Sequence, residues 1–490
     1  MAFLGRDIDR SGSKGIASRG DSDEIDPEEV AGRSDGLAWV VRPWAKPRWV
    51  AGVAATLVVA FFLALLFPGA FTFDSIIMVE QADDTVVDTN WHPPVAIEVW
   101  AFLLVFVRSA VGLWVAQTVG LGLAFYSVAR SLTSKVALAL LVVVVVGFPP
   151  FLQVVAPLWK DSQLAIVYLA ALGLSSRPAT TWPKRVALGL VALAIVALRF
   201  NAFLLAILPL WRLVESLPEA YWRRSVFRWV GSRPVLLALG LTFGITAATS
   251  YTGSLLVERS LAPQNPTQVW DMVGILVEGG DVEFSARMQR QPPCSEQEII
   301  ATYDPGSVGP LTYGDDTCFA IIWPDDYEVH SLRAEENNQV STGAWIATIV
   351  DNPGPYARHR MAATTSLVGA EDRPMRGSSI GLQATEARVS TVDATRQQVG
   401  TLKYMRSVSR NLSFMYRPFV WMVTLVLGAG VLWFRNADRR WIALMVIPLA
   451  ATLGIMMLLS PVATMRYSFP FLVAAIFLLV QAVDHLLVRE

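Results

Sequence analysis

Long apolar runs alternate with short polar segments along most of the chain. A helix needs about 20 apolar residues to cross a bilayer. Runs close to that length cover 49–67, 111–129, 136–158, 234–256, 418–434, 441–459 and 468–487. Shorter apolar runs cover 162–174, 186–198 and 202–214. This pattern predicts an α-helical polytopic membrane protein with about ten transmembrane helices.

The apolar run 95–107 is short and contains Glu98, so its side of the membrane has to be inferred from its neighbours. The basic segment 42–48 precedes the first span and predicts a cytoplasmic N-terminus, because positive charge is enriched in cytoplasmic loops. If 95–107 does not cross, four further basic segments also fall inside: 129–135, 175–185, 221–233 and 434–440. We therefore expect 93–107 to be a helix in the outer interface, with both termini of the chain cytoplasmic.

The run 186–214 is interrupted by "RFN" at 199–201 and is flanked at both ends by basic residues. Both flanks inside the cell predict a helical hairpin. Each arm of about 13 residues would reach only about 20 Å at 1.5 Å per residue. We therefore expect the turn to lie below the outer surface, in a depression lined by protein or water.

This topology divides the chain into four parts. Residues 1–36 are polar and predict a disordered cytoplasmic tail. Residues 37–256 form a transmembrane core, with a first outer loop at 68–110. Residues 257–416 are richer in polar and turn-forming residues and predict an extracytoplasmic α+β insertion, with an opening helix at 266–279. Residues 417–490 supply the last transmembrane helices.

The composition agrees with a membrane protein and bears on the compartment. Of the 490 residues 53% are hydrophobic and only 17% are charged, and the net charge is −1. No basic stripe suggests nucleic acid. The only two cysteines, Cys294 and Cys318, both lie in the insertion. In an oxidising outer compartment they predict a disulfide, and the alternative is a pair of buried thiols.

Ionisable residues gather in the outer turns, where they are the candidates for chemistry. Such groups at membrane depth are costly and usually functional. The catalytic candidates are Asp74, His92 and Asp161, the phosphate-binding candidates are Lys160, Arg199 and Arg466, and the supporting residues are Ser75, Asn201 and Tyr467. A carboxylate can accept a proton from an attacking hydroxyl, and Asp74 is the first candidate for this base. Cations can hold the phosphate of a lipid-linked donor.

Each candidate also has a simpler structural interpretation. Asp74 could cap an interfacial helix, and Ser75 could assist it. His92 precedes two prolines and could be a turn residue. Asp161 is a favourable charge in the first turn of a helix. Asn201 could only turn the chain, and Arg466 could reach to the interface.

Two aspartate pairs in the insertion raise the question of a metal. Asp315/Asp316 and Asp325/Asp326 offer oxygen ligands of the kind that Mg²⁺ or Mn²⁺ takes. Such doublets more often form solvated turns, so we expect no metal site there. A divalent cation is optional for the chemistry, because arginine alone can stabilise a phosphate leaving group.

The order of these residues resembles that of the GT-C superfamily of membrane glycosyltransferases, in a bacterial branch with the series "DS…HPP…KD…R-x-N…RY". The series corresponds here to Asp74–Ser75, 92–94, Lys160–Asp161, 199–201 and Arg466–Tyr467. The resemblance covers roughly 49–256 and 418–487. One departure is that many family members carry the soluble domain after the last span, whereas here it precedes the final three.

The resemblance implies an inverting glycosyltransferase of the bacterial plasma membrane with an extracytoplasmic active site. The donor would be a polyprenyl-phosphate-linked sugar, and the acceptor an envelope glycan, lipid or protein. Asp74 would match the catalytic base, and Lys160 and Arg199 the contacts to the donor phosphate. Three alternatives stay open: a polymerase or ligase acting on lipid diphosphates, a glycolipid transporter, and a scaffold without enzymatic activity.

Overall fold

The structure is a computed structural model, and it describes 48–67, 69–84, 92–217, 234–257, 264–284, 294–312, 318–319, 341–370, 403–404, 407–408, 411–435, 437–460 and 468–488. The expected tail 1–36 lies outside these residues. So do Arg466, Tyr467 and the aspartate doublets Asp315/Asp316 and Asp325/Asp326.

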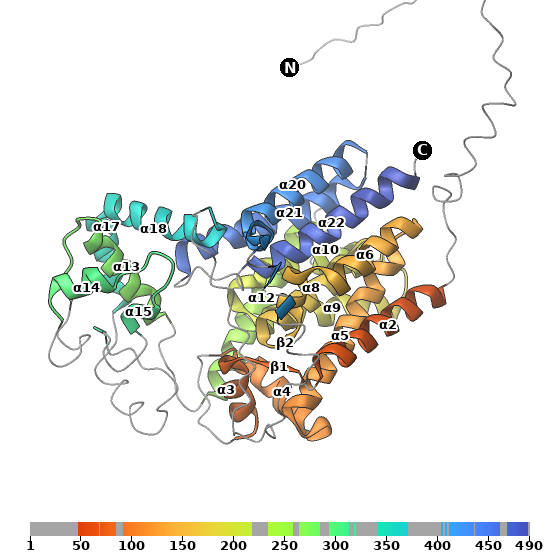
Figure 1. Cartoon of the computed structure of the whole chain (residues 1–490), viewed down its shortest axis with the longest axis horizontal. Helices are drawn as coiled ribbons and strands as arrows, with labels where there is room; N and C mark the ends of the chain where they lie inside the picture. The colour runs from red at the N-terminus through yellow and green to blue at the C-terminus, as the bar shows by residue number, and fades with distance from the viewer. Residues whose placement is uncertain are drawn as a thin grey trace, which may run out of the picture. The chain divides into compact units, whose positions relative to one another are not determined.

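Helices dominate the described residues (Figure 1). The elements before the insertion are α2 (Arg48–Leu66), β1 (Ala70–Phe71), α3 (Phe73–Ala82), α4 (Pro94–Val107), α5 (Ala110–Ser131), α6 (Lys135–Gly147), α7 (Pro149–Val155), β2 (Pro157–Leu158), α8 (Lys160–Ser175), α9 (Trp182–Leu198), η1 (Phe200–Ala206), α10 (Ile207–Glu215) and α12 (Pro234–Leu256). The elements after it are η4 (Ser413–Tyr416), α20 (Pro418–Phe434), α21 (Arg439–Leu459) and α22 (Phe469–Val488).

Five of the described helices are long and apolar enough to cross a membrane: α2, α5, α12, α21 and α22. A sixth span results if the bent pair α6 and α7 counts as one. Every apolar run predicted as a crossing is helical, but α8, α9, α10 and α20 are shorter than a full span. The described residues therefore belong to an α-helical protein of the membrane type. They contain five or six helices of full spanning length, and the ten crossings expected from the sequence stay a prediction.

The run 136–158 is not one straight helix. Its axis bends by 66° between α6 and α7, where Phe148 takes an extended conformation before Pro149 and Pro150. A residue before proline is driven out of the helical region, which explains the break. The chain then runs through α7 into β2 and brings 157–161 to the candidate site.

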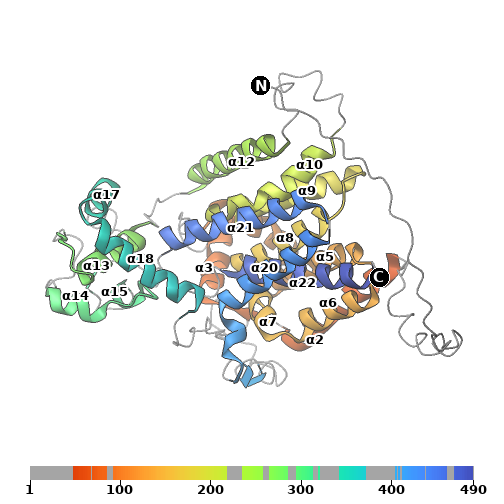
Figure 2. The same ribbon diagram turned by 90° about the horizontal axis from the view of Figure 1, so that it is seen from above.

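The run 186–214 folds back on itself, as the sequence predicts. Helix α9 ends at Leu198, Arg199 is extended, and a short 3-10 helix leads into α10, which packs against α9. Figure 2 shows α12 along the edge of the bundle beside α10. The break places Arg199 at the tip of the hairpin.

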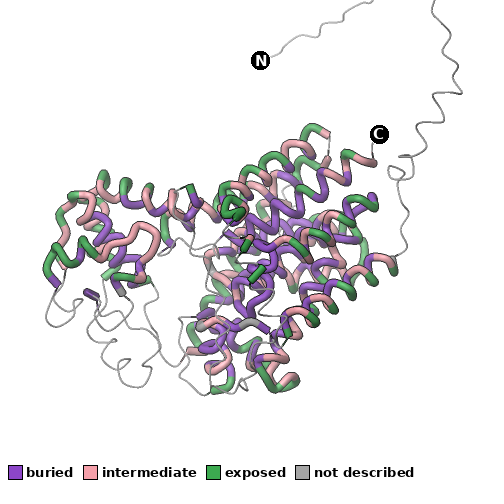
Figure 3. The backbone as a smooth tube through the Cα atoms, in the orientation of Figure 1, coloured by how far each residue is buried: buried purple, intermediate pink, exposed green. Residues whose placement is uncertain are grey.

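The burial pattern fits a bundle whose outer surface meets lipid (Figure 3). Large aromatic side chains such as Trp100, Trp114 and Phe125 are buried between the helices, whereas Leu57 and Leu123 are each about two-thirds exposed. Soluble monomers rarely expose apolar side chains over a wide area. The arrangement is therefore typical of helices that face a bilayer.

Two short strands join segments far apart in the chain. β1 pairs in parallel with β2, so that Phe71 lies opposite Leu158. Gly69 precedes β1 with φ +118°, and an added Cβ would lie 2.7 Å from the ring of Trp114. The Trp114 indole in turn donates to the carbonyl of Ala156 at 2.8 Å. This packing fixes the segment after α2 against the segment before α8.

The described part of the insertion is helical. It comprises α13 (Asn265–Val277), α14 (Glu296–Thr302), α15 (Gly309–Thr312), α17 (Thr342–Asp351) and α18 (Pro353–Val368). The predicted opening helix corresponds to α13. The strands expected of an α+β domain are not found among the described residues, where the insertion has one isolated bridge between Asp304 and Ser307. Cys294 and Cys318 form a disulfide with their Cα atoms 5.5 Å apart.

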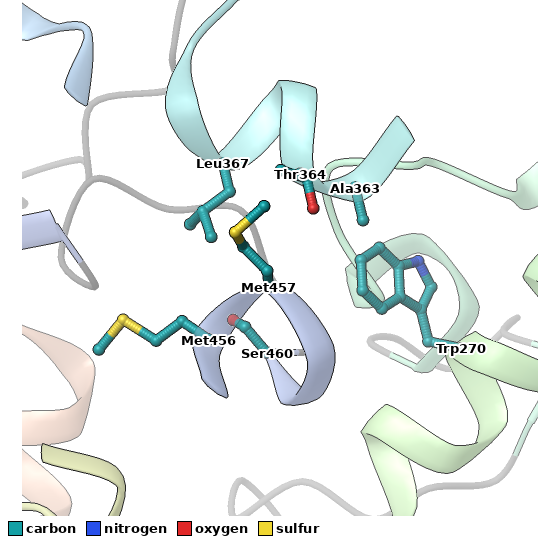
Figure 4. A pocket seen from close by; sticks show the side chains of 7 residues that line it. All are labelled: Trp270, Ala363, Thr364, Leu367, Met456, Met457 and Ser460. Carbon is teal, nitrogen blue, oxygen red and sulfur yellow. The ribbon is translucent and has the colours of Figure 1, made fainter. Parts of the chain in front are cut away.

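The insertion packs on the end of α21. The hydroxyl of Thr267 donates to Leu459 O at 3.3 Å, and Arg360 donates to Ser460 O at 3.0 Å. Because the last carbonyls of a helix lack partners within it, these two side chains complete the end of α21. A small pocket lies at this junction (Figure 4), lined by Trp270, Ala363, Thr364, Leu367, Met456, Met457 and Ser460.

Candidate active site

Three consecutive residues at the start of α8 each contact a polar side chain from another part of the chain. The indole Nε1–H of Trp159 donates to Asp74 Oδ2 at 3.0 Å. Lys160 Nζ lies 2.7 Å from His92 Nδ1, and Asp161 Oδ1 lies 2.8 Å from Arg199 Nε. We call these six residues the Asp74 cluster. The structure thus brings together five of the predicted site residues.

Asp74 lies in the first turn of α3, which has a well-defined N-terminus. The hydroxyl of Thr72 accepts from the backbone N–H of Ser75, and Ser75 Oγ accepts from the N–H of Thr72. Ser75 also donates its hydroxyl to Leu158 O. The capping role expected of Ser75 is therefore present, and it also ties α3 to β2. A carboxylate in a first helical turn is stabilised by the helix dipole, which favours the anionic form that a base needs.

His92 and Lys160 form the second pair. His92 is buried, at 1% exposure, two residues before α4 begins. An ammonium group has only donors, so Lys160 donates and Nδ1 of His92 accepts. His92 therefore holds Lys160 in position.

Asp161 and Arg199 form the third pair, across the tip of the α9–α10 hairpin. Asp161 is 1% exposed, and the Arg199 side chain is 12% exposed. A buried carboxylate holds a guanidinium group firmly in place. Asn201, two residues further on, is half-buried, and its Oδ1 accepts no hydrogen bond within the part of the chain that the structure describes. The hairpin tip therefore presents a fixed cation beside an amide oxygen that still needs a donor.

Glu80 belongs to the same loop and sits on the last turns of α3. Partial burial raises the pKa of Glu80 above its usual value. Arg466 and Tyr467, the remaining members of the predicted site, lie outside the described residues. Helix α22 begins close by, because Phe469 packs edge-on against Trp159 with the ring centroids 6.5 Å apart.

Trp159 is the site residue that the sequence reading missed. Tryptophans at the ends of apolar runs are typical interfacial anchors, and that interpretation hides a more specific role. The available signal was its place directly before Lys160 and Asp161. In the structure Trp159 is buried and is a positioning residue for the Asp74 carboxylate.

Replacing Trp159 by phenylalanine keeps the ring against Phe469 but removes the N–H donor. A hydrogen bond to a charged group contributes about 1.5–3 kcal/mol, so we expect turnover to fall about 10- to 100-fold. KM should change little, because the indole contacts Asp74, the candidate base, and not a group proposed to bind substrate. The control is Trp100→Phe, since Trp100 is equally buried but donates to Gln163 at 3.0 Å. Equal losses in both variants would assign Trp159 a purely structural role.

A second set of buried polar groups lies inside the insertion. Asp271 Oδ1 contacts His359 Nε2 at 3.0 Å and Arg360 Nη2 at 2.5 Å, and Asp271 Oδ2 accepts from Trp345 at 3.0 Å. The other ring nitrogen of His359 lies 2.7 Å from Tyr303 Oη. We call Asp271, Tyr303, Trp345, His359 and Arg360 the Asp271 network. Asp271 and His359 are fully buried, so the network holds the insertion together rather than meeting a substrate.

The described residues contain no group of three or more His, Cys, Asp and Glu side chains placed to hold a metal ion. The pocket of Figure 4 shares no residue with the Asp74 cluster, and apolar side chains and two hydroxyls form its lining. The Asp74 cluster is therefore the stronger candidate for chemistry, because it combines carboxylates with cations.

Comparison with known proteins finds no matching protein family, no matching curated protein and no matching solved structure.

Proposed function

We propose that the protein is an integral membrane glycosyltransferase that uses a polyprenyl-phosphate-linked sugar. One observation carries the proposal. At the start of α8, Trp159 contacts the Asp74 carboxylate, Lys160 supplies one cation, and Asp161 holds the second cation, Arg199. In this proposal ten segments cross the plasma membrane of a bacterium, both termini are cytoplasmic, and the site is extracytoplasmic. The acceptor is an envelope glycan, lipid or protein.

The proposed reaction is a single displacement with inversion. Asp74 takes the proton from the acceptor hydroxyl, and the acceptor oxygen attacks the anomeric carbon. The bond between that carbon and the phosphate oxygen breaks, and its electron pair stays on the phosphate. Lys160 and Arg199 stabilise the negative charge of the departing polyprenyl phosphate. Asn201 Oδ1 is an acceptor for a sugar hydroxyl.

The geometry supports these roles in two ways. His92 and Asp161 hold the two cations by direct contacts of 2.7 and 2.8 Å, so little reorganisation is needed when charge develops on the phosphate. The indole N–H of Trp159 holds one carboxylate oxygen of Asp74 by a hydrogen bond of 3.0 Å. The apolar helices around the site offer a surface to the lipid tail of the donor.

The second candidate is a polymerase or ligase that acts on lipid-diphosphate-linked glycans. The observation that favours it is that Lys160, paired with the buried His92, directly precedes Asp161, the partner of Arg199. In that chemistry the cations would bind a diphosphate, and activity would depend on them more than on Asp74.

The test is a donor panel with the full-length protein in phospholipid vesicles. Labelled polyprenyl-monophosphate hexoses and pentoses, and matching diphosphates, are incubated with envelope-glycan fragments. We expect release of polyprenyl monophosphate with one monophosphate donor, and a product whose anomeric configuration is inverted. Turnover with diphosphates alone would contradict the transferase and favour the polymerase or ligase. Movement of intact glycolipid across the bilayer without bond cleavage would indicate a transporter.

A further inference from the structure

A group of cations lies at the other end of α8 from the Asp74 cluster. Arg130 lies in the last turn of α5, Arg177 follows α8, and Lys184 and Arg185 lie in the first turn of α9. We call these four residues the basic platform. Since α8 rises about 1.5 Å per residue over its 16 residues, the platform lies roughly 24 Å along the helix from Lys160.

Backbone carbonyls hold three of these cations in place. Arg177 donates to Ser131 O at 3.1 Å, and Lys184 donates to Arg177 O at 2.7 Å and to Pro178 O at 3.2 Å. Arg185 donates to Ser216 O at 2.7 Å and to Ala179 O at 3.3 Å. Carbonyl groups orient these side chains without neutralising their charge. Each cation keeps further N–H donors beyond these contacts.

The carboxylates at this end of the bundle serve a different residue. Glu215 and Asp438 pair with Arg212, at 2.5 and 3.1 Å. Among the described residues, no ion pair includes Arg130 or Arg177, and none includes Lys184 or Arg185. The platform therefore retains its positive charge.

Lys184 lies among these charges, just before the apolar part of α9. Burial is the main reason that the pKa of Lys184 falls to about 8, and the positive charges of Arg212, Arg177 and Arg130 contribute in the same direction. A bound anion would offset both effects and favour the protonated ammonium group.

An apolar strip runs along α9 from the same end. Trp182 is 73% exposed and Leu190 is 61% exposed, and Val186 and Leu193 are also exposed. Their spacing of four, four and three residues places them on one face of the helix. A tryptophan at such a position is typical of the headgroup level of a membrane. The strip therefore places this end of α9 at the membrane surface, within reach of lipid headgroups.

We propose that the basic platform binds the phosphate headgroup of an anionic phospholipid at the membrane surface, at the level that the exposed Trp182 marks. Basic pockets between transmembrane helices bind anionic headgroups in this manner. The platform lies at the opposite end of α8 from the Asp74 cluster and shares no residue with it. The inference therefore stands independently of the proposed glycosyltransferase activity.

Lipid binding is measured by native mass spectrometry of the full-length protein in detergent, titrated with dioleoyl-phosphatidylglycerol or dioleoyl-phosphatidylcholine. We expect tighter retention of phosphatidylglycerol. The double variant Arg177→Gln/Lys184→Gln should bind phosphatidylglycerol about 10- to 30-fold more weakly, because the attraction between each cation and the anionic headgroup contributes to the binding affinity. The control variant is Arg440→Gln, an exposed cation at the start of α21 and outside the platform. Equal affinity for the two lipids, or an unchanged double variant, would overturn the proposal.

The native protein supplies a second test that needs no substitution. Lys184 loses its proton as the pH rises through about 8, whereas the phosphodiester of phosphatidylglycerol and the arginines keep their charges. Affinity should therefore fall between pH 7 and pH 9. Binding that does not change over this range would contradict a role for Lys184. Millimolar inorganic phosphate should not displace the lipid, and full displacement would mean that the platform is a site for soluble anions.

Discussion

The variant Asp74→Asn should lose about 100- to 10,000-fold of the native turnover, the usual contribution of a general base. Asparagine has nearly the same shape, and its side-chain oxygen can still accept from the Trp159 indole. The substitution therefore removes the capacity to take a proton and leaves the surrounding contacts in place. The measurement is the initial rate of sugar transfer from the donor selected in the panel, with purified protein in lipid.

The matched control for this prediction is Glu98→Gln. Glu98 is an exposed carboxylate on α4, in the same outer loop as Asp74. Its variant should keep the native rate. A native rate in Asp74→Asn would remove Asp74 from the mechanism, and Asp161 and His92 would become the next candidates for the base. A loss in Lys160→Met and Arg199→Met but not in Asp74→Asn would favour diphosphate chemistry.

The variant Asp271→Asn should destabilise the insertion by about 3–5 kcal/mol, the usual cost of removing one partner from a buried ion pair. Arg360 would remain buried with its charge unbalanced, and an amide N–H₂ would face the donors of His359 or Trp345. We expect the melting temperature to fall by at least about 10 °C. Amide hydrogen exchange in α13 and α18 should become faster, whereas exchange in α5 and α8 should not.

Asp281→Asn provides the control, because Asp281 is exposed on the same insertion and only its backbone groups bond with Asn352. It should melt with the native protein. If Asp271→Asn also melts with the native protein, the Asp271 network does not hold the insertion together. In that case the contact of Arg360 with Ser460 would need another explanation than the joining of the insertion to α21.

Local patterns were sufficient to predict much of the fold. Apolar length predicted the helices, the "RFN" interruption predicted the hairpin at Arg199, and Pro266 near a helix start predicted α13. The bend at Phe148 was present in the sequence as two prolines, but the uninterrupted apolar character of 136–158 concealed it. Hydropathy measures composition along a segment and does not measure the direction of its axis.

Contacts between distant segments were harder to predict. The charge pattern correctly grouped Asp74, His92, Lys160, Asp161 and Arg199 at one end of the bundle. It did not predict which would pair, because pairing depends on the β1–β2 register and on the exit from α7. Trp159 was missed because an indole N–H has no signature in a charge pattern. The Asp271 network was missed because Asp271 and His359 lie 88 positions apart.

The pairing of β1 with β2 also sets an order of events while the chain is being made. Trp159 leaves the ribosome 85 residues after Asp74. At about 5–20 residues per second this is a delay of roughly 4–17 s. Throughout that interval α3 has a cap but none of the contacts that fix it to β2. A stalled or truncated chain that ends before Leu158 would therefore carry Asp74 without β2, Trp159 and the other partners in the Asp74 cluster.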